Sequence, residues 1–217
     1  VAFIGSTGSG KTTLVNLLPR FFDITEGTIR FGDIDIRDVS QKELRDRIGY
    51  VPQKGILFSG TIASNLRYAD ESLSDEKMEE ALSVSQAKEF VDRMPNGVNE
   101  PIAQGGTNVS GGQKQRLSIA RALAKDAQVY IFDDTFSALD YATDAKLRAA
   151  LAELITKKHA TVFIVAQRIS SIMHADKIIV LDQGKMAGIG THEELLKSCE
   201  VYQEIAHSQL SREELGE

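Results

Sequence analysis

The sequence of 217 residues has little of what several classes of protein require. Its only cysteine, Cys199, has no second cysteine with which to form an internal disulfide, which favours a reducing compartment. The four histidines and this cysteine show no metal-ligand spacing. The longest purely apolar runs are short, such as "VFIVA" at residues 162–166, and none could span a bilayer. These absences argue against a disulfide framework and a zinc site.

Positive charge is also scarce. The formal net charge is -6, so the electrostatic footprint of a nucleic-acid-binding surface is not expected, and we expect no nucleic-acid partner. Hydrophobic residues make up 42% and charged residues 26%, which is ordinary for a soluble globular protein. The length suits one large domain or one domain with a sizeable insertion. The chain starts at Val1, inside an expected strand, which suggests a fragment of something longer.

Short apolar strands alternate with helical patterns along most of the chain. Helices are expected at residues 112–124, 142–156 and 191–198. Such alternation predicts an α/β fold with a mostly parallel sheet covered on both faces. The expected strands are "VAFIG", "IGYVPQ", "QVYIFDD", "ATVFIVAQ" and "DKIIVLDQG".

Other local patterns complete this outline. "KTTLVNLLPR" predicts a helix with its leucines on one face, and "GTIRFGDIDI" a hairpin around Gly32-Asp33. Ser40 and Glu43 predict a capping box. From about residue 60 to 108 the pattern becomes helical, polar and acidic, which predicts an inserted helical subdomain. The polar tail "SQLSREELGE" is expected to be frayed.

The strongest chemical signal is "GSTGSGKTT", which fits G-x-x-x-x-G-K-[ST] between a strand and a helix. Its glycines allow several backbone N–H groups to point at one anion, and the helix N-terminus adds positive potential. Lys11 can reach the β and γ phosphates, and Thr12 can offer a hydroxyl to magnesium. The expected phosphate-binding residues are Gly5, Ser6, Thr7, Gly8, Ser9, Gly10, Lys11, Thr12 and Thr13.

A second helix start of this kind occurs in "NVSGGQKQRLSIARAL". Ser110 and Gln113 predict a capping box for the helix that follows. Gly111 and Gly112 are poor helix formers in a first turn, and they leave backbone N–H groups uncovered for a phosphate. Two such sites in one chain raise the possibility of two nucleotides held between two copies.

With these motifs in place, the chain resembles the nucleotide-binding domain of an ATP-binding cassette (ABC) transporter of the exporter kind, from Val1 to about Glu204. The resemblance implies a P-loop NTPase (RecA-like) core with an inserted helical subdomain and truncated N-terminal antiparallel strands. It implies one domain over residues 1–217, with the core at 1–59 and 109–204, the helical subdomain at about 60–108 and a tail at 205–217. The motifs are "GSTGSGKTT", "VPQ", "VSGGQ", "VYIFDD" and "SALD", with "LFSGTIASNL" and "DQGKMAGIGTHEELL" typical of exporters.

The resemblance also implies roles for single residues. Thr12, Gln53 and Asp133 would surround Mg²⁺ beside ATP. Ser110, Gly111, Gly112 and Gln113 belong to the signature motif, which would close over the ATP of the opposite subunit. Asp140 would contact that partner, and Arg116 would support the signature helix. Residues 53–66 would meet the transmembrane domains.

Two positions depart from the family pattern. Asp134 stands where a glutamate usually polarises the attacking water, and the missing methylene withdraws its carboxylate by roughly an ångström. Gln167 stands where histidine is usual; its amide can donate a hydrogen bond but carries no positive charge. Withdrawing the Asp134 carboxylate by roughly an ångström can lower the rate of hydrolysis about a hundredfold. Both changes affect hydrolysis and spare binding, so the site is expected to hold ATP and cleave it slowly.

The expected assembly follows from this pairing of sites. The chain would supply a degenerate site of its own and would complete a competent site on an unlike second nucleotide-binding domain, at the cytoplasmic face of a membrane. An ordinary homodimeric exporter ATPase remains an alternative. A non-transport ABC ATPase, a P-loop kinase and a binding module that never hydrolyses are further alternatives. The acidic balance argues against the non-transport ATPase, and the signature motif argues against the kinase. The transported substrate is not specified by these residues.

Overall fold

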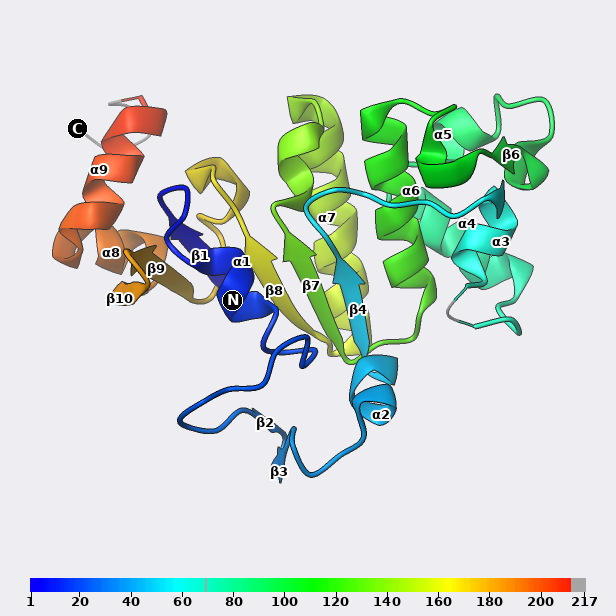
Figure 1. Cartoon of the computed structure of the whole chain (residues 1–217). Helices are drawn as coiled ribbons and strands as arrows, with labels where there is room; N and C mark the ends of the chain where they lie inside the picture. Colours follow the sequence, from blue (N-terminus) through cyan, green and yellow to red (C-terminus); the bar gives the residue numbers. More distant parts are fainter. Residues whose placement is uncertain (69, 212–217) are drawn as a thin grey trace. The chain divides into compact units, whose positions relative to one another are not determined.

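The computed structural model describes residues 1–68 and 70–211 (Figure 1). These residues form two compact units. The first unit contains Val1–Ile48, Ile131–Ser137 and the described residues from Val162 onward, and the second contains those of Gly49–Tyr130 and Ala138–Thr161. Within the described ranges, no helix combines the length and the apolar character needed to cross a membrane.

The elements of the first unit centre on strand β1. Strand β1 pairs in parallel with β8 on one side and with β9 on the other, while β10 pairs antiparallel with β9. The expectation of a mostly parallel sheet is confirmed for these pairs. The bounds are β1 Ala2–Gly5, α1 Lys11–Val15, β2 Arg30–Phe31, β3 Ile34–Asp35, α2 Gln41–Asp46, β8 Thr161–Val165, β9 Ile178–Asp182, β10 Lys185–Gly190, α8 His192–Ser198 and α9 Glu200–Gln209.

The elements of the second unit are mostly helical. Helix α4 carries the buried stripe Met78, Ala81 and Leu82. The bounds are α3 Ile62–Leu66, α4 Asp75–Val84, α5 Lys88–Val91, α6 Gly111–Ala124 and α7 Tyr141–Lys158, with the short pair β5 Gly60–Thr61 and β6 Pro101–Ile102. The chain passes between the units within strands β4 Ile48–Val51 and β7 Val129–Asp133, within the short helix Thr135–Ala138 and at the start of β8. The strand order of the main sheet is β10-β9-β1-β8-β7-β4 among the described residues.

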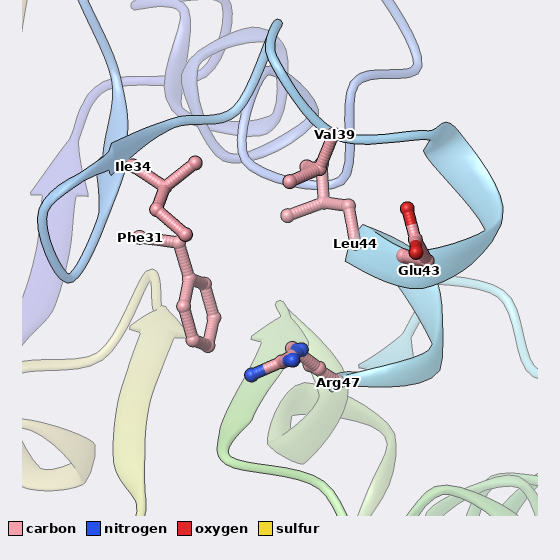
Figure 2. A pocket seen from close by; sticks show the side chains of 6 residues that line it. All are labelled: Phe31, Ile34, Val39, Glu43, Leu44 and Arg47. Carbon is pink, nitrogen blue, oxygen red and sulfur yellow. The ribbon is translucent and has the colours of Figure 1, made fainter.

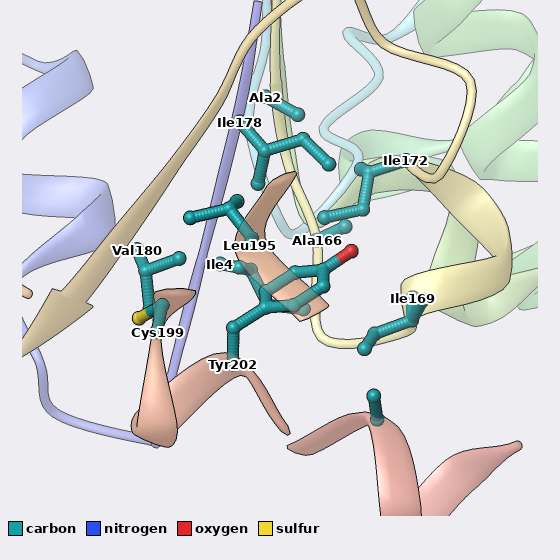
Figure 3. Close-up of a cluster of buried hydrophobic side chains, with 11 residues drawn as sticks. Ala2, Ile4, Ala166, Ile169, Ile172, Ile178, Val180, Leu195, Cys199 and Tyr202 are labelled. Carbon is teal, nitrogen blue, oxygen red and sulfur yellow. The ribbon is translucent and has the colours of Figure 1, made fainter. Parts of the chain in front are cut away.

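A core of apolar side chains lies in the first unit, where helices α8 and α9 pack on strands β1 and β9 (Figure 3). Ile4 from β1, Val180 from β9 and Tyr202 from α9 are fully buried there. Cys199 is a free, buried thiol in the same cluster, as expected of a packing residue. Because this core lies under β1, it supports the strand that leads directly into the P-loop motif.

Several local predictions are confirmed. The hairpin pairs Phe31 with Ile34 across Gly32-Asp33, and the capping box of Ser40 and Glu43 is complete. Helices α6, α7 and α8 begin and end within two residues of the expected bounds. These features depend on residues that are close in sequence, which is why the pattern alone is sufficient to predict them.

Other predictions are wrong in part. Helix α1 ends at Val15, and the next residues continue as turns with i→i+3 hydrogen bonds, because Pro19 has no N–H and disfavours helical geometry for Leu18. The strand expected over "DKIIVLDQG" stops at Asp182, and Gln183-Gly184 form a turn into β10. Ser208 and Gln209, the first two residues of the tail expected to be frayed, belong to α9. Residues 212–217 of that tail lie outside the described residues.

Candidate functional site

The P-loop motif forms a tight turn between β1 and α1. Gly8 and Gly10 adopt φ values of +82° and +96°, which side chains other than glycine rarely adopt. The N–H of Ser9 donates to the carbonyl of Ser6 at 3.1 Å. The N–H of Gly184 donates to the carbonyl of Ser9 at 3.2 Å, so the β9–β10 turn also holds this loop. Gly184 was not among the predicted site residues, and the only sequence signal for it is the turn-forming pair Gln183-Gly184.

Lys11 is buried at the start of α1. Its Nζ donates to the carbonyls of Gly5 and Ser6, each at 2.8 Å, and to Ser9 Oγ at 3.3 Å. Burial lowers the pKa of Lys11 from its ordinary value, while the carboxylates of Asp134 and Asp133 act to raise it. The ammonium group is therefore directed into the curl of the loop, where it faces the carbonyls that glycine geometry brings together.

Thr12 and Asp133 meet directly, although they lie far apart in sequence. Thr12 Oγ1 donates to Asp133 Oδ1 at 2.9 Å. Asp133 is the last residue of β7 and is only 1% exposed. A hydroxyl and a carboxylate are hard oxygen donors of the type that Mg²⁺ prefers. The two residues expected to bind magnesium in the first unit are thus adjacent.

Asp134 follows at once, in an unusual backbone conformation. Its φ of +45° lies in the left-handed region, where aspartate is more common than most other residues. Its N–H donates to the carbonyl of Val165 at 3.0 Å. Gln167 Nε2 donates to Asp134 Oδ2 at 2.6 Å. The structure therefore brings together the two residues at which the sequence departs from the family pattern.

The signature motif lies in the second unit, at the start of α6. Ser110 Oγ accepts from the N–H of Gln113 at 3.2 Å, and Gln113 Oε1 accepts from the N–H of Ser110 at 2.9 Å, so the expected capping box is present. A side chain added at Gly111 would meet nothing within 4 Å. The helix N-terminus is thus uncovered on this side within the unit.

Arg116 stabilises this end of the helix. Its NH1 group donates to the carbonyl of Gln86 at 2.9 Å, and its guanidinium lies 4.7 Å from the ring centroid of Phe90. Burial lowers the pKa of Arg116, while Asp140 and Glu89 act to raise it. These contacts tie the signature helix to the helical part of the same unit.

The segment after Gln53 is held against α6 by hydrogen bonds. The N–H of Gly55 donates to Gln115 Oε1 at 3.1 Å, and an Arg121 NH2 group donates to the carbonyl of Ile56 at 2.8 Å. Arg121 also lies 5.1 Å from the ring centroid of Phe58. Large apolar side chains remain exposed here: Ile56, Phe58 and Tyr68.

Asp140 has a structural role within its own helix. Its carboxylate accepts from the N–H of Thr143 at 2.9 Å and so caps α7. Hydrogen bonding with Thr143, through its side chain first and its backbone N–H second, lowers the pKa of Asp140. The side chain is exposed, which leaves part of it accessible to a partner.

A pocket is lined by six residues of the first unit, and none of the predicted site residues is among them (Figure 2). The lining residues are Phe31, Ile34, Val39, Glu43, Leu44 and Arg47.

Among residues 1–68 and 70–211, no group of three or more His, Cys, Asp or Glu side chains could hold a metal ion. Proteins usually bind Mg²⁺ through one or two carboxylates plus phosphate oxygens and waters.

The predicted site residues therefore divide between the units. Lys11, Thr12, Asp133, Asp134 and Gln167 gather in the first unit. Gln53 and the signature residues belong to the second unit.

Comparison with known proteins shows which family the chain matches. Residues 1–137 match the family model described as ABC transporter. The chain is 49% identical over 211 residues to an uncharacterized ABC transporter ATP-binding protein of Mycobacterium tuberculosis, covering 96% of this chain and 36% of that protein. It is 42% identical to an ATP-dependent lipid A-core flippase of Desulfotalea psychrophila, covering 96% of this chain and 36% of that protein. The chain thus spans about a third of the length of these relatives.

A solved structure gives the same result. A bacterial Atm1-family ABC exporter with ATP bound superposes with a TM-score of 0.91 at 36% sequence identity. The superposition covers 97% of this chain and 36% of that chain.

Proposed function

Since this chain belongs to the ABC transporter family and has its P-loop NTPase fold, we propose that it is the ATP-binding domain of an exporter. In this proposal it holds Mg-ATP and hydrolyses it slowly at its own site. The observation that carries ATP binding is the meeting of Thr12 with Asp133 beside a P-loop that holds Lys11, and the slow rate rests on the identities of Asp134 and Gln167. The flippase and the Atm1-family exporter support the assignment to export. The domain would span residues 1–217. Its core would lie at 1–59 and 109–204, its helical subdomain at about 60–108 and its tail at 205–217.

Phosphate binding rests on the loop and on Lys11. The positive φ values of Gly8 and Gly10 curl the loop, and a loop of this kind can direct backbone N–H groups at an anion. Lys11, already directed into the loop, supplies the positive charge that phosphate oxygens attract. The roles of Gly5, Ser6, Thr7, Ser9 and Thr13 in lining the phosphates are part of this proposal.

Thr12 and Asp133 would hold Mg²⁺ in the first unit, while the role of Gln53 as a further Mg²⁺ ligand stays a prediction from the sequence. The adjacency of the Thr12 hydroxyl and the Asp133 carboxylate fits such an ion. When bound, Mg²⁺ supplies charge neutralisation for the phosphate oxygens. The task of the two side chains is to fix the ion beside the P-loop, because both are attached to rigid elements, α1 and β7.

Slow hydrolysis would follow from Asp134 and Gln167. The Asp134 carboxylate reaches less far than a glutamate, and Gln167 directs a neutral amide toward it, where a histidine could carry charge. Both residues can still orient a water and a phosphate oxygen by hydrogen bonds. Their contact positions them without supplying the full electrostatic stabilisation that rapid turnover needs.

The remaining site would be shared with a partner. The uncovered start of α6 would close over ATP held by a second, unlike nucleotide-binding domain through Ser110, Gly111, Gly112 and Gln113. The exposed apolar side chains of Ile56, Phe58 and Tyr68 would meet a transmembrane domain, and the chain would then lie at the cytoplasmic face of a membrane.

A homodimeric exporter ATPase with near-normal turnover is the second candidate. The same contact favours it, since a hydrogen-bonded base and orienting group is the usual arrangement of an active hydrolase. The two candidates differ in the rate that the natural residues support.

Steady-state ATP hydrolysis by the natural full-length protein decides between them. The double change Asp134→Glu and Gln167→His should raise turnover about a hundredfold, and binding of Mg-ATP should change little. The exposed Asp38→Glu is a matched control and should have no effect. Brisk turnover by the unaltered protein, with little gain from the double change, would establish the second candidate instead.

A further inference from the structure

The side chain of Gln209 contacts the backbone of the loop that carries Gln167. Gln209 is the last residue of α9. Its Nε2 donates to the carbonyl of Gln167 at 2.8 Å. Its Oε1 accepts from the N–H of Ile169 at 2.9 Å. One amide group thus bonds to both ends of a three-residue segment that is distant in sequence.

Both sides of this contact are anchored in the core of the first unit. The side chain of Ile169 is fully buried in the cluster shown in Figure 3. Tyr202 and Ala206, from the same helix as Gln209, are fully buried in that cluster too. The helix continues to bond up to its end, where the N–H of Leu210 donates to the carbonyl of Ala206 at 2.8 Å. Gln209 therefore projects from a well-packed helix.

The segment it holds is otherwise exposed. Gln167 and Arg168 are exposed between the buried residues Ala166 and Ile169. An exposed glutamine samples several rotamers, and its amide reaches a fixed acceptor only when its backbone is held. The Gln209 amide donates a hydrogen bond to the backbone carbonyl of Gln167 and so holds this backbone in place. The side chain of the same Gln167 donates a hydrogen bond to Asp134.

We propose that Gln209 is a positioning residue for the hydrolysis step, which acts by fixing the Gln167 backbone so that its amide meets Asp134. This inference rests on the proposed function and adds a residue of the C-terminal helix to the site. Gln209 is too far along the chain for any motif to include it. Its effect on the nucleotide passes entirely through Gln167.

The test replaces Gln209 by a residue of similar length that cannot form either bond. In the natural full-length protein, Gln209→Met should slow conversion of bound radiolabelled ATP about tenfold, measured in a single turnover with protein in excess. The Kd for Mg-ATP should be unchanged, since the P-loop is untouched. The matched control is Gln203→Met, because Gln203 lies on the same helix and donates to the carbonyl of Leu196 at 2.7 Å. It should convert ATP at the unaltered rate.

A double-mutant cycle separates positioning from a general loss of structure. In a Gln167→Ala background, Gln209→Met should slow the reaction no further, because its route of action is gone. An additional, independent tenfold loss would overturn the proposal. Equal rates for Gln209→Met and Gln203→Met would overturn it as well, and would leave the proposed function standing.

Hydrogen exchange gives a reading that needs no hydrolysis. The amide of Ile169 should exchange faster in Gln209→Met than in the unaltered protein or in Gln203→Met. Unchanged exchange would mean that the amide does not hold the loop. If the unaltered protein converted no bound ATP, the hydrolytic part of the proposed function would fail, and the role of Gln209 in that step would fail with it.

Discussion

The P-loop and the signature loop are both glycine-containing turns before a helix, yet glycine serves different purposes in them. In the P-loop, Gly8 and Gly10 have positive φ, and Gly10 is the N-cap residue of α1, which has no side-chain cap. In the signature loop, Gly111 and Gly112 lie within the helical first turn of α6, and Ser110 caps it. The first pair is needed for the shape of the backbone, whereas the second leaves a normal helix start uncovered.

This difference in glycine conformation indicates how each loop would bind a phosphate. The P-loop would surround an anion with its own backbone and would add the buried cation of Lys11. The signature loop offers a helix N-terminus with open space at Gly111. The P-loop is thus specialised in conformation and charge, and the signature loop in access.

Removing the charge of Lys11 should have the largest effect. Lys11→Met should weaken binding of Mg-ATP about a hundredfold, because it removes charge-assisted hydrogen bonds worth about 1.5–3 kcal/mol each. The control Lys42→Met removes a surface lysine, whose side chain is 86% exposed, and should leave affinity unchanged. Titration calorimetry measures both. Equal affinities would show that charge is not what distinguishes the P-loop.

A glycine-to-alanine substitution should lower the free energy of unfolding when it is made in the P-loop, but not when it is made in the signature loop. Neither Gly8 nor Gly111 has an atom within 4 Å of an added Cβ, so the pair differs in backbone conformation alone. Gly8→Ala should cost about 1–2 kcal/mol of unfolding free energy because of its positive φ. Gly111→Ala should cost nothing or add up to about 1 kcal/mol, because alanine is a better helix former. Chemical denaturation measures this, and equal losses at both positions would remove the distinction.

The pH dependence of ATP binding should be the smallest effect. Burial lowers the pKa of Lys11, so its ammonium loses its proton as pH rises through a value below 10.5, and affinity for Mg-ATP then falls. Lys11→Arg keeps its charge at these pH values and should remove the fall. We expect a change of about a few-fold, measured by equilibrium binding between neutral and alkaline pH. A fall that persists in Lys11→Arg would assign the titration to another group.

Much of the site could be predicted because its parts are local. The capping boxes of Ser40 with Glu43 and of Ser110 with Gln113 involve residues three apart, and the P-loop is one short motif between a strand and a helix. By contrast, the length of α1 and the helical state of Ser208-Gln209 were missed. Pro19 shortens the first, and burial of Tyr202 and Ala206 against the core stabilises the second, an effect that requires the strands beneath it.

The sequence by itself determined the order of strands and helices, the glycine positions of both loops and the identities of Asp134 and Gln167. Only the tertiary structure decided that Gln167 meets Asp134, and that Gln209 meets the backbone beside it. These contacts join residues 33 and 42 positions apart in the chain. Their geometry depends on the pairing of β1 with β8 and β9 and on the packing of α9, and local patterns do not encode the register of distant strands.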